Sequence, residues 1–370
     1  MIFLYAEIPN IYTMNLIIPA AGQSSRFPEM RPKWMLTHPN GNLMLAEAIR
    51  GLVFPDLEKI YLTVLSAHLK EFQCLDGIKK QFRQMGLGDK LVVVALDTPT
   101  QSQPETVARA IERQNIQGPI CIKDSDNYFR LKILEKNFVS VVDLNEVGFV
   151  NPSNKSYAAV NENRFITNIV EKRVISNFFC SGAYGFEDAQ EYLYYFNTLS
   201  SQKNLYISHI IYQMLLEDKA FSAAVCTDYS DWGTLKDWNR YKSQFGTVFV
   251  DLDGTLVRNS GEYFEPVWGK TEGLKENIQA INRLYDSGKV QIIITTSRKE
   301  EARQLTLQQL EREGLRYHQI IFGLNHGKRV VVNDYARSNP FKSCDSVNMA
   351  RNATDLGEML EALLRIEGEA

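Results

Sequence analysis

The 370-residue sequence has few of the residues that usually build metal centres or disulfide bonds. It contains five cysteines and five histidines. The cysteines are scattered without a CxxC pair, and the histidines show no metal-binding spacing such as HxxxH. This pattern argues against a zinc site and a disulfide framework. It favours a reducing compartment, so we expect a cytoplasmic protein with buried thiols.

Long apolar runs and a strong charge of one sign are also missing. The formal net charge is −3, with 44% hydrophobic and 23% charged residues. No apolar run approaches the roughly 20 residues that cross a bilayer. The first residues lack the basic start and sustained apolar core of a signal peptide. We therefore expect no membrane insertion, and no nucleic acid as the main partner.

The order of apolar segments predicts an α/β protein of more than one domain. Apolar strands alternate with helical patterns, which favours largely parallel sheets. The best boundary lies near 243–246, after a helical stretch that begins at about Leu235. We therefore predict an extension over 1–13 and domains over 14–244 and 245–370. Apolar spacing also predicts an amphipathic helix over 356–366.

Two aspartates follow an apolar strand in the segment FVDLDGTLV, residues 249–257. Asp251 and Asp253 are two apart, so both can point at one metal ion and one phosphoryl group. Gly254 allows a tight turn beside them. Asp251 can attack phosphorus when a divalent cation screens the repulsion, and Asp253 can act as acid and base. The alternative is an acidic strand-to-turn junction without chemistry.

This segment resembles motif I of the haloacid dehalogenase-like (HAD) phosphohydrolases, and the resemblance covers about the last third of the chain. Residues 290–298, VQIIITTSR, are similar to motif II. The resemblance implies that Thr296 is a phosphate ligand, with Thr295 as the neighbouring alternative. Lys328 corresponds to the motif III lysine that neutralises the phosphoryl-aspartate.

Residues 330–334, VVVND, resemble the motif IV strand of that family with its acidic end. Asn333 and Asp334 stand where the family has two acids, so one charge is lost. The implied Mg²⁺ ligands are Asp251, Asp253, Asn333 and Asp334, because an amide oxygen can still bind the ion. The segments between the motifs hold one helix at about 271–287 and another within 299–327. They leave no room for a cap domain, and the detailed pattern resembles small phosphatases of capsule biosynthesis.

A loop of small residues follows the first apolar strand, Leu16–Ile18. Its backbone N–H groups can approach phosphate oxygens, and two cations, Arg26 and Lys33, can stabilise a triphosphate and its leaving pyrophosphate. Neither GxxxxGK[ST] nor GxGxxG occurs here. The alternative is a turn beside a solvated basic patch. The loop residues are Ala20, Ala21, Gly22, Gln23, Ser24 and Ser25.

The same stretch resembles the AAGxxxR and PK signature of nucleotidyltransferases with a GT-A-like, Rossmann-like fold. Further segments extend the resemblance in order over 14–242. It implies nucleobase contacts from Gln103 and Thr106, Mg²⁺ ligands Asp126 and Asp231, and acceptor contacts from Glu171, Lys172, Gly182 and Tyr184. Asp124 is an additional metal ligand or a plain strand-end acid.

Together the resemblances predict a bifunctional, Mg²⁺-dependent enzyme of capsular or other surface polysaccharide synthesis. Its nucleotidyltransferase domain joins an NTP to a sugar or polyol phosphate, and its capless HAD-like domain hydrolyses a phosphate monoester. Lys172 would neutralise the attacking phosphate, which needs no general base. CTP is the first expectation, with dTTP, UTP and GTP open, as is homo-oligomer formation. The alternatives are a non-catalytic, regulatory HAD-like domain and a GT-A glycosyltransferase, since Asp124-Ser125-Asp126 is a DxD.

Overall fold

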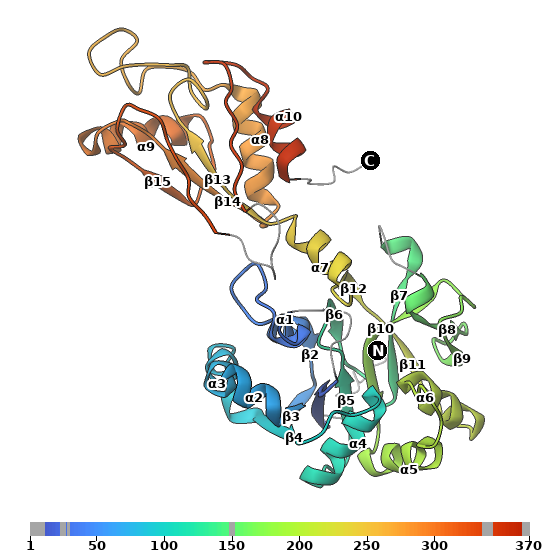
Figure 1. Ribbon diagram of the computed structural model, residues 1–370. Coiled ribbons are helices and arrows are strands. Elements are labelled where there is room, and N and C mark those ends of the chain that lie inside the picture. The colour runs from blue at the N-terminus through green and yellow to red at the C-terminus, as the bar shows by residue number, and fades with distance from the viewer. Residues whose placement is uncertain (1–11, 23–26, 28–29, 148–151, 335–342, 365–370) are drawn as a thin grey trace, which may run out of the picture. The chain divides into compact units, whose positions relative to one another are not determined.

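The chain forms two compact units (Figure 1). The computed structural model describes residues 12–22, 27, 30–147, 152–334 and 343–364. The boundary between the units falls between Trp238 and Asn239, inside helix α7 (Leu235–Lys242). The sequence predicts it a few residues later, at 244–245. Within the described ranges, no helix is long and apolar enough to cross a membrane.

The first unit is built on a nine-stranded mixed sheet with the order β11-β7-β10-β5-β1-β3-β4, to which β8 and β9 attach beside β10. Strands β5, β1, β3 and β4 are parallel, and β10 runs antiparallel to β5 and β7. The bounds are β1 Thr13–Ala20, β3 Asp56–Leu65, β4 Leu91–Leu96, β5 Ile120–Lys123, β7 Phe138–Asp143, β8 Ser156–Val160, β9 Ile166–Glu171, β10 Phe178–Phe186 and β11 Ser222–Val225.

Alternation along the strands sends apolar side chains to both faces of this sheet. In β1, Ile17 enters one buried cluster, whereas Leu16 and Ile18 enter the other. Successive side chains of a strand point to opposite faces, so a strand covered on both sides is apolar throughout. This explains why the segment from Met14 to Ala20 reads as one continuous apolar run apart from Asn15 and Pro19.

Helices cover both faces of the sheet (Figure 1). Apolar residues of α4, α5 and α6 pack in the cluster that contains Ile17, and those of α1 and α3 pack in the other. Ser102 directly precedes helix α4, and its hydroxyl accepts from the Glu105 amide at 3.3 Å, a typical N-cap. The bounds are α1 Met44–Arg50, α2 Ser66–Phe72, α3 Leu75–Gln84, α4 Gln103–Gln114, α5 Ala189–Leu199 and α6 Ile207–Leu216.

A smaller sheet in the same unit has the order β12-β6-β2. Strand β6 (Asn127–Lys132) pairs antiparallel with β12 (Thr227–Asp231) and parallel with β2 (Leu52–Val53). Strand β6 begins a few residues after β5 ends, so the connecting residues lie at the carboxyl end of β5 in the large sheet. The start of β6 and the end of β12 meet, because Asn127 stands opposite Asp231.

The second unit contains a three-stranded parallel sheet, β13-β14-β15. Helix α8 packs on β14, and α10 packs on α8. The predicted helix near 271–287 forms as α8, and the predicted C-terminal helix forms as α10 within the described residues. The bounds are β13 Gly246–Asp251, β14 Val290–Thr295, β15 Gln319–Ile321, α8 Lys275–Asp286, α9 Arg303–Arg312 and α10 Leu356–Leu364.

The predicted strand over 330–334 does not form. Its residues have no ladder partner in the described structure, and the side chains of Val330, Val331 and Val332 are 72%, 58% and 89% exposed. Three valines favour an extended backbone, but a strand is stabilised by hydrogen bonds to a neighbour and by burial of one face. Neither is present here, so this prediction was wrong.

Candidate functional site

The phosphate-binding loop predicted after β1 lies partly outside the described residues. Ala20 is the last residue of strand β1, and Ala21 after it is fully buried. Gly22 is exposed, and a Cβ added there would have no atom within 4 Å. Gln23, Ser24, Ser25 and Arg26 fall outside the described ranges. The roles predicted for these four residues stay predictions.

Lys33, which follows that loop, contacts one of the predicted metal-binding acids. It begins a short 3₁₀ turn, Lys33–Met35, whose next residues Trp34 and Met35 are buried and anchor the backbone. The Lys33 ammonium forms an ion pair with the Asp126 carboxylate. Both side chains are largely shielded, 21% and 11% exposed. Two predicted site residues that are far apart in the sequence therefore contact each other here.

Asp126 and Asp231 come together through the pairing of β6 with β12. The Trp232 amide donates to the Asp126 carbonyl at 2.9 Å, which continues the ladder beyond Asn127 and Asp231. The Asp231 carboxylate accepts from the Gly233 amide at 3.0 Å and from the Lys155 ammonium at 2.6 Å. Each acid is thus paired with its own lysine at the meeting point of the two strands.

Asp124 lies beneath this meeting point, against β10. Its carboxylate accepts from the Gln103 side chain, at the start of α4. A Cβ at Gly182 would lie 2.5 Å from an oxygen of Asp124, so only glycine fits beside that carboxylate. Burial, reinforced by the neighbouring Asp126, raises the pKa of Asp124 above its ordinary value. Gln103 and Gly182, predicted for the base and the acceptor, therefore both contact Asp124.

Lys123 is fully buried, and the sequence reading did not single it out. Its ammonium donates to the Asp124 carbonyl at 2.8 Å and to the Asn127 carbonyl at 3.2 Å, and it bonds to the Asn127 side-chain oxygen. It also lies 4.6 Å from the centre of the Phe129 ring. The lysine therefore closes the turn that carries Asp124 and Asp126. A lysine inside an otherwise apolar strand was the available signal.

The predicted acceptor residues Glu171 and Lys172 form a separate polar cluster at the end of β9. The Glu171 carboxylate accepts from the hydroxyls of Ser156 and Ser208, the latter at 3.0 Å. The Lys172 ammonium donates to the Tyr206 hydroxyl at 2.6 Å and lies over its ring. These hydrogen bonds connect the end of β9 to the start of α6, and they leave Lys172 exposed at the surface.

Tyr184 and Thr106, which the sequence predicts to contact the acceptor and the nucleobase, are both buried. Tyr184 belongs to the apolar cluster of β5, β7 and β10, and burial raises its pKa well above the ordinary value. The Thr106 hydroxyl lies 2.6 Å from that of Thr100 and bonds to the Ser102 carbonyl at 3.2 Å. In this structure, both side chains pack inside the first unit.

In the second unit, Asp251 ends β13 at the carboxyl edge of the parallel sheet, opposite Thr295 of β14. Its carboxylate lies 3.0 Å from the Arg329 guanidinium. Burial raises the pKa of Asp251 above its ordinary value, and the Arg329 charge opposes this shift. Gly254 follows with φ +89°, the left-handed conformation that the predicted tight turn needs.

Asp253 is held by a buried guanidinium. Arg298 donates to both oxygens of the Asp253 carboxylate at 2.8 Å, and the Ser260 hydroxyl donates to one of them at 2.8 Å. A further Arg298 nitrogen donates to Thr306 at 3.1 Å and to Gln309 at 2.8 Å, both on α9. The sequence reading did not assign Arg298 a role. Its position directly after the TTS segment was the available signal.

The remaining predicted phosphatase residues differ in their surroundings. Thr296 is buried and accepts from the Arg298 amide at 3.1 Å, whereas the Thr295 hydroxyl donates to the Val250 carbonyl at 3.3 Å. Lys328, Asn333 and Asp334 are exposed and lie outside regular secondary structure. Asp251 and Thr295 thus lie opposite each other at the carboxyl ends of β13 and β14. Within the segment from 328 to 334, Arg329 contacts Asp251, whereas Lys328, Asn333 and Asp334 are exposed.

The fit of a divalent cation can be judged from the donors. Asp126 and Asp231 offer carboxylate oxygens, which are the ligands that Mg²⁺ prefers, and Asp251 and Asp253 offer the same chemistry. Among the described residues, no cluster of three or more acidic, histidine or cysteine side chains could hold a metal ion. Any cation would therefore rely on two carboxylates and on oxygens from its substrate.

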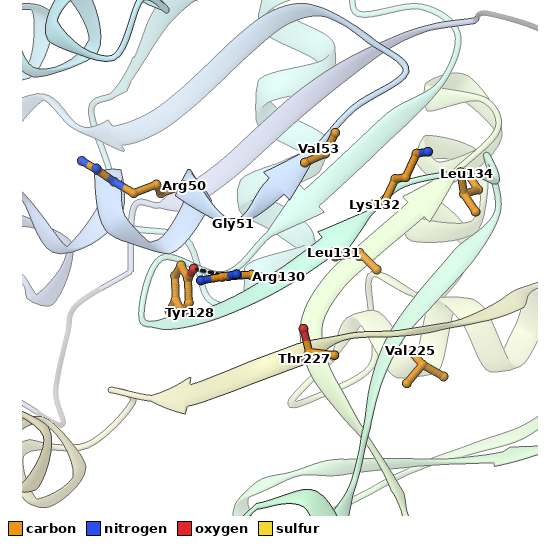
Figure 2. Close-up of a pocket in the computed structure, with 10 residues that line it drawn as sticks. All are labelled: Arg50, Gly51, Val53, Tyr128, Arg130, Leu131, Lys132, Leu134, Val225 and Thr227. Atoms are coloured by element: carbon orange, nitrogen blue, oxygen red, sulfur yellow. Dashed lines mark hydrogen bonds between the residues drawn. The ribbon is translucent and has the colours of Figure 1, made fainter. Parts of the chain in front are cut away.

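A shallow cavity of about 580 Å³ opens elsewhere on the first unit (Figure 2). Apolar side chains of Val53, Leu134 and Val225 line it together with Arg50 and Arg130. Both arginines already pair with acids, Glu47 and Asp228 respectively. None of the predicted site residues lines this cavity, and we assign the chemistry to the paired acids instead.

Comparison with known proteins identifies the fold. No protein-family model and no curated protein sequence matches this chain. The nucleoside-diphosphate-sugar pyrophosphorylase from Vibrio cholerae RC9 matches in structure over 61% of this chain and 98% of its own, with TM-score 0.51 and 18% identity. The inositol-1-phosphate CTP transferase from T. maritima matches over 63% and 95%, with TM-score 0.49 and 15% identity.

The likeness to the Vibrio cholerae structure defines the class of fold. The chain contains a mixed α/β fold with a Rossmann-like sheet, shared with that pyrophosphorylase over 61% of its length. The Rossmann-like α/β fold predicted for the first part of the sequence is therefore confirmed. That the second unit is HAD-like stays a prediction from the sequence motifs described above.

Proposed function

We propose that the first unit transfers a nucleotidyl group from an NTP to a phosphorylated sugar or polyol and releases pyrophosphate. The observation that carries this proposal is the meeting of Asp126 and Asp231 at the paired ends of β6 and β12, with Lys33 on Asp126. The fold shared with a nucleoside-diphosphate-sugar pyrophosphorylase supports it. The order of the AAGxxxR, PK and Asp-Asn segments supports it further.

The residues divide the work of the transfer by charge. Lys33, together with Arg26, stabilises the negative charge that develops on the departing pyrophosphate. Lys172 binds the phosphate of the acceptor, whose oxygen is already a nucleophile and needs no general base. Mg²⁺ bound by Asp126 and Asp231 would lower the repulsion between the two anionic substrates. Asp124, half-buried and bonded to Gln103, orients the turn that carries Asp126.

We propose for the second unit a phosphate-monoester hydrolase with Asp251 as the nucleophile. Asp251 lies at the carboxyl edge of the parallel strands, 34% exposed and therefore accessible to a phosphoryl group. Asp253 would assist the leaving group, and Thr296 and Lys328 would bind the phosphoryl oxygens. A role in making precursors of surface polysaccharide rests on the sequence resemblance.

One observation favours a second candidate for this unit, a regulatory module without activity. Both oxygens of Asp253 are occupied by Arg298. Arg298 would have to release one of these oxygens before Asp253 could pass a proton to a leaving group. In this alternative the unit releases no phosphate from any ester, and Asp251→Asn leaves every activity unchanged.

The test of both proposals is a single screen for product. The full-length protein is incubated with Mg²⁺, each of CTP, UTP, dTTP, GTP and ATP, and a panel of sugar and polyol phosphates. Pyrophosphate and phosphate are followed in the same wells. Acceptor-dependent pyrophosphate from one NTP supports nucleotidyl transfer. In parallel wells that hold a nucleotide sugar in place of the NTP, release of nucleoside diphosphate without pyrophosphate would instead establish the glycosyltransferase alternative.

Two substitutions separate the units. We expect Asp126→Ala to lower pyrophosphate release by about 100-fold or more, because charge-stabilising groups contribute on that scale, while phosphate release is unchanged. Asp251→Asn should abolish phosphate release and leave pyrophosphate release intact, because an amide is not a nucleophile. Initial rates of both products on both variants check this. Loss of pyrophosphate release in Asp251→Asn would contradict two separate sites.

A further inference from the structure

Lys155, directly before strand β8, occupies an unusual position for a lysine. Its ammonium lies 2.6 Å from the Asp231 carboxylate and 2.6 Å from the Tyr229 hydroxyl. The same ammonium lies 5.2 Å from the Tyr229 ring centre and 5.8 Å from that of Phe179. Only 12% of the Lys155 side chain is exposed. The ammonium is thus held by two polar groups and two aromatic faces, not extended into solvent.

The position of Lys155 also links it to the predicted acceptor residue. The Lys155 carbonyl accepts from the Lys172 amide at 2.9 Å, where Ser156 and Glu171 pair β8 with β9. Lys155 therefore joins Asp231, on one side, to the segment that presents Lys172, on the other. The residues around Lys155 give no sign of this ion pair in the sequence, because its partner Asp231 comes from a distant strand.

The oxygens of Asp231 leave little room for a second cation. One oxygen accepts from the Gly233 amide, and the other contacts the Lys155 ammonium. Mg²⁺ binds carboxylate oxygens at about 2.0–2.1 Å. An ion at that distance from the oxygen would lie close to the ammonium, and two cations in partly buried surroundings repel strongly. We therefore expect the ammonium to move away when a divalent cation binds.

We propose that Lys155 and a divalent cation compete for the Asp231 carboxylate, so that Lys155 controls cation binding at this site. This inference rests on the proposed function, which makes Asp231 a cation ligand. The displaced Lys155 ammonium stays close to the segment that carries Lys172, because the two backbones are hydrogen-bonded. The anionic phosphate of the acceptor neutralises it there. Cation and phosphorylated substrate therefore bind together, and the cation binds weakly without the phosphate.

The test measures cation binding directly, with Mn²⁺ as the probe and electron paramagnetic resonance to count the unbound ion. The full-length protein is titrated without nucleotide or acceptor. We expect Lys155→Met to bind Mn²⁺ about tenfold or more tightly than the wild type, because one competing charge is removed. Lys136→Met is the matched control, since Lys136 pairs with Glu187 at 2.9 Å in an exposed position. It should bind Mn²⁺ as the wild type does.

Unchanged or weaker Mn²⁺ binding by Lys155→Met would overturn the competition. Asp231→Asn should lose the tight binding in either background, and undiminished binding there would show that the cation does not use Asp231. A second measurement serves if Lys155→Met fails to fold. In the wild type, Mn²⁺ should increase the rate of reductive methylation of Lys155, read by mass spectrometry, and an unchanged rate contradicts the proposal. Pyrophosphate release, measured separately, tests the proposed function itself.

Discussion

At the scale of single residues, two buried cations organise the acids of the two units. Lys123 is fully buried beside Asp124 and Asp126, and Arg298 is 1% exposed on Asp253. Burial of a charge is costly unless hydrogen bonds and opposite charges compensate. Both cations are compensated, and both fix the backbone that follows an apolar strand. The positions of the proposed catalytic carboxylates therefore depend on residues that contact no substrate in our proposal.

The burial of Lys123 predicts a dependence of stability on pH. Burial lowers the pKa of Lys123 from 10.5 to about 8, while Asp124 and Asp126 oppose the shift. Between these values the unfolded chain holds a proton that the folded protein has released, so stability rises with pH in that window. We expect the unfolding free energy of the wild type to rise by about 2 kcal/mol relative to Lys123→Met between pH 7 and 10.

Urea unfolding of the wild type and Lys123→Met at a series of pH values measures this difference. Titrating groups away from Lys123 are common to both proteins, so their effects cancel in the comparison. Parallel curves for the two proteins would contradict the lowered pKa. A wild-type curve that falls relative to the variant would contradict its sign.

At the scale of elements, the sites form where strands end or are interrupted. Strand β10 has an irregular register between Cys180 and Tyr184 as it pairs with β7, and Gly182 lies inside this irregularity with φ +102°. The Asp124 amide donates to the Gly182 carbonyl at 2.9 Å. The interruption thus brings the backbone of β10 against the turn that carries the acids.

Gly182→Ala tests this close approach. A Cβ there would lie 2.5 Å from Asp124 and 2.6 Å from Asn127, in a backbone conformation that alanine rarely adopts. We expect a loss of about 2 kcal/mol or more in unfolding free energy, together with slower pyrophosphate release. Gly118→Ala is the matched control, because φ is +69° but nothing lies within 4 Å of its added Cβ. Equal losses in the two variants, by urea unfolding, would argue against the contact.

The segment 330–332 shows where element prediction failed. Its three valines have the composition of a buried strand, yet all three are exposed without a ladder partner in the described structure. Strand propensity is largely the ability to pack on neighbouring strands, so it cannot decide whether such a neighbour exists. The positions of Asn333 and Asp334, predicted from this strand, consequently lack the support of a sheet.

At the scale of the whole molecule, each unit has its own apolar core. The first packs apolar residues on both faces of the nine-stranded sheet, and the second packs them around β13, β14 and the helices α8 and α10. Cores of this kind usually unfold as cooperative units. A substitution that breaks buried contacts in one core should therefore affect one thermal transition.

Arg298→Met provides this test. Removing the guanidinium leaves the Asp253 carboxylate without its buried partner, so we expect the second unit to lose about 3 kcal/mol of stability. Differential scanning calorimetry should show one transition at lower temperature and the other unchanged. Arg316→Met, which breaks an exposed pair with Asp286, should leave both transitions within about 0.5 kcal/mol. A uniform shift of both transitions would contradict separate cores.

Much of the site was predictable because it lies where strands end. Asp126, Asp251 and Asp253 each follow an apolar strand, and a strand's carboxyl end is recognisable from the switch to acids and glycine. The partners of these acids were not predictable. Lys155, Arg298 and the contact of Gln103 with Asp124 join segments that are distant in sequence, and no local pattern encodes such pairings.

The sequence by itself determined the α/β class, the approximate division of the chain, and the strand ends that carry the proposed catalytic acids. These features follow from local periodicity and from residue types with few alternative uses. Only the tertiary structure decided which charge neutralises each acid, that Gly182 must be glycine, and that 330–332 has no strand partner. Those outcomes depend on distances between segments far apart in the chain, and a one-dimensional pattern contains no such distances.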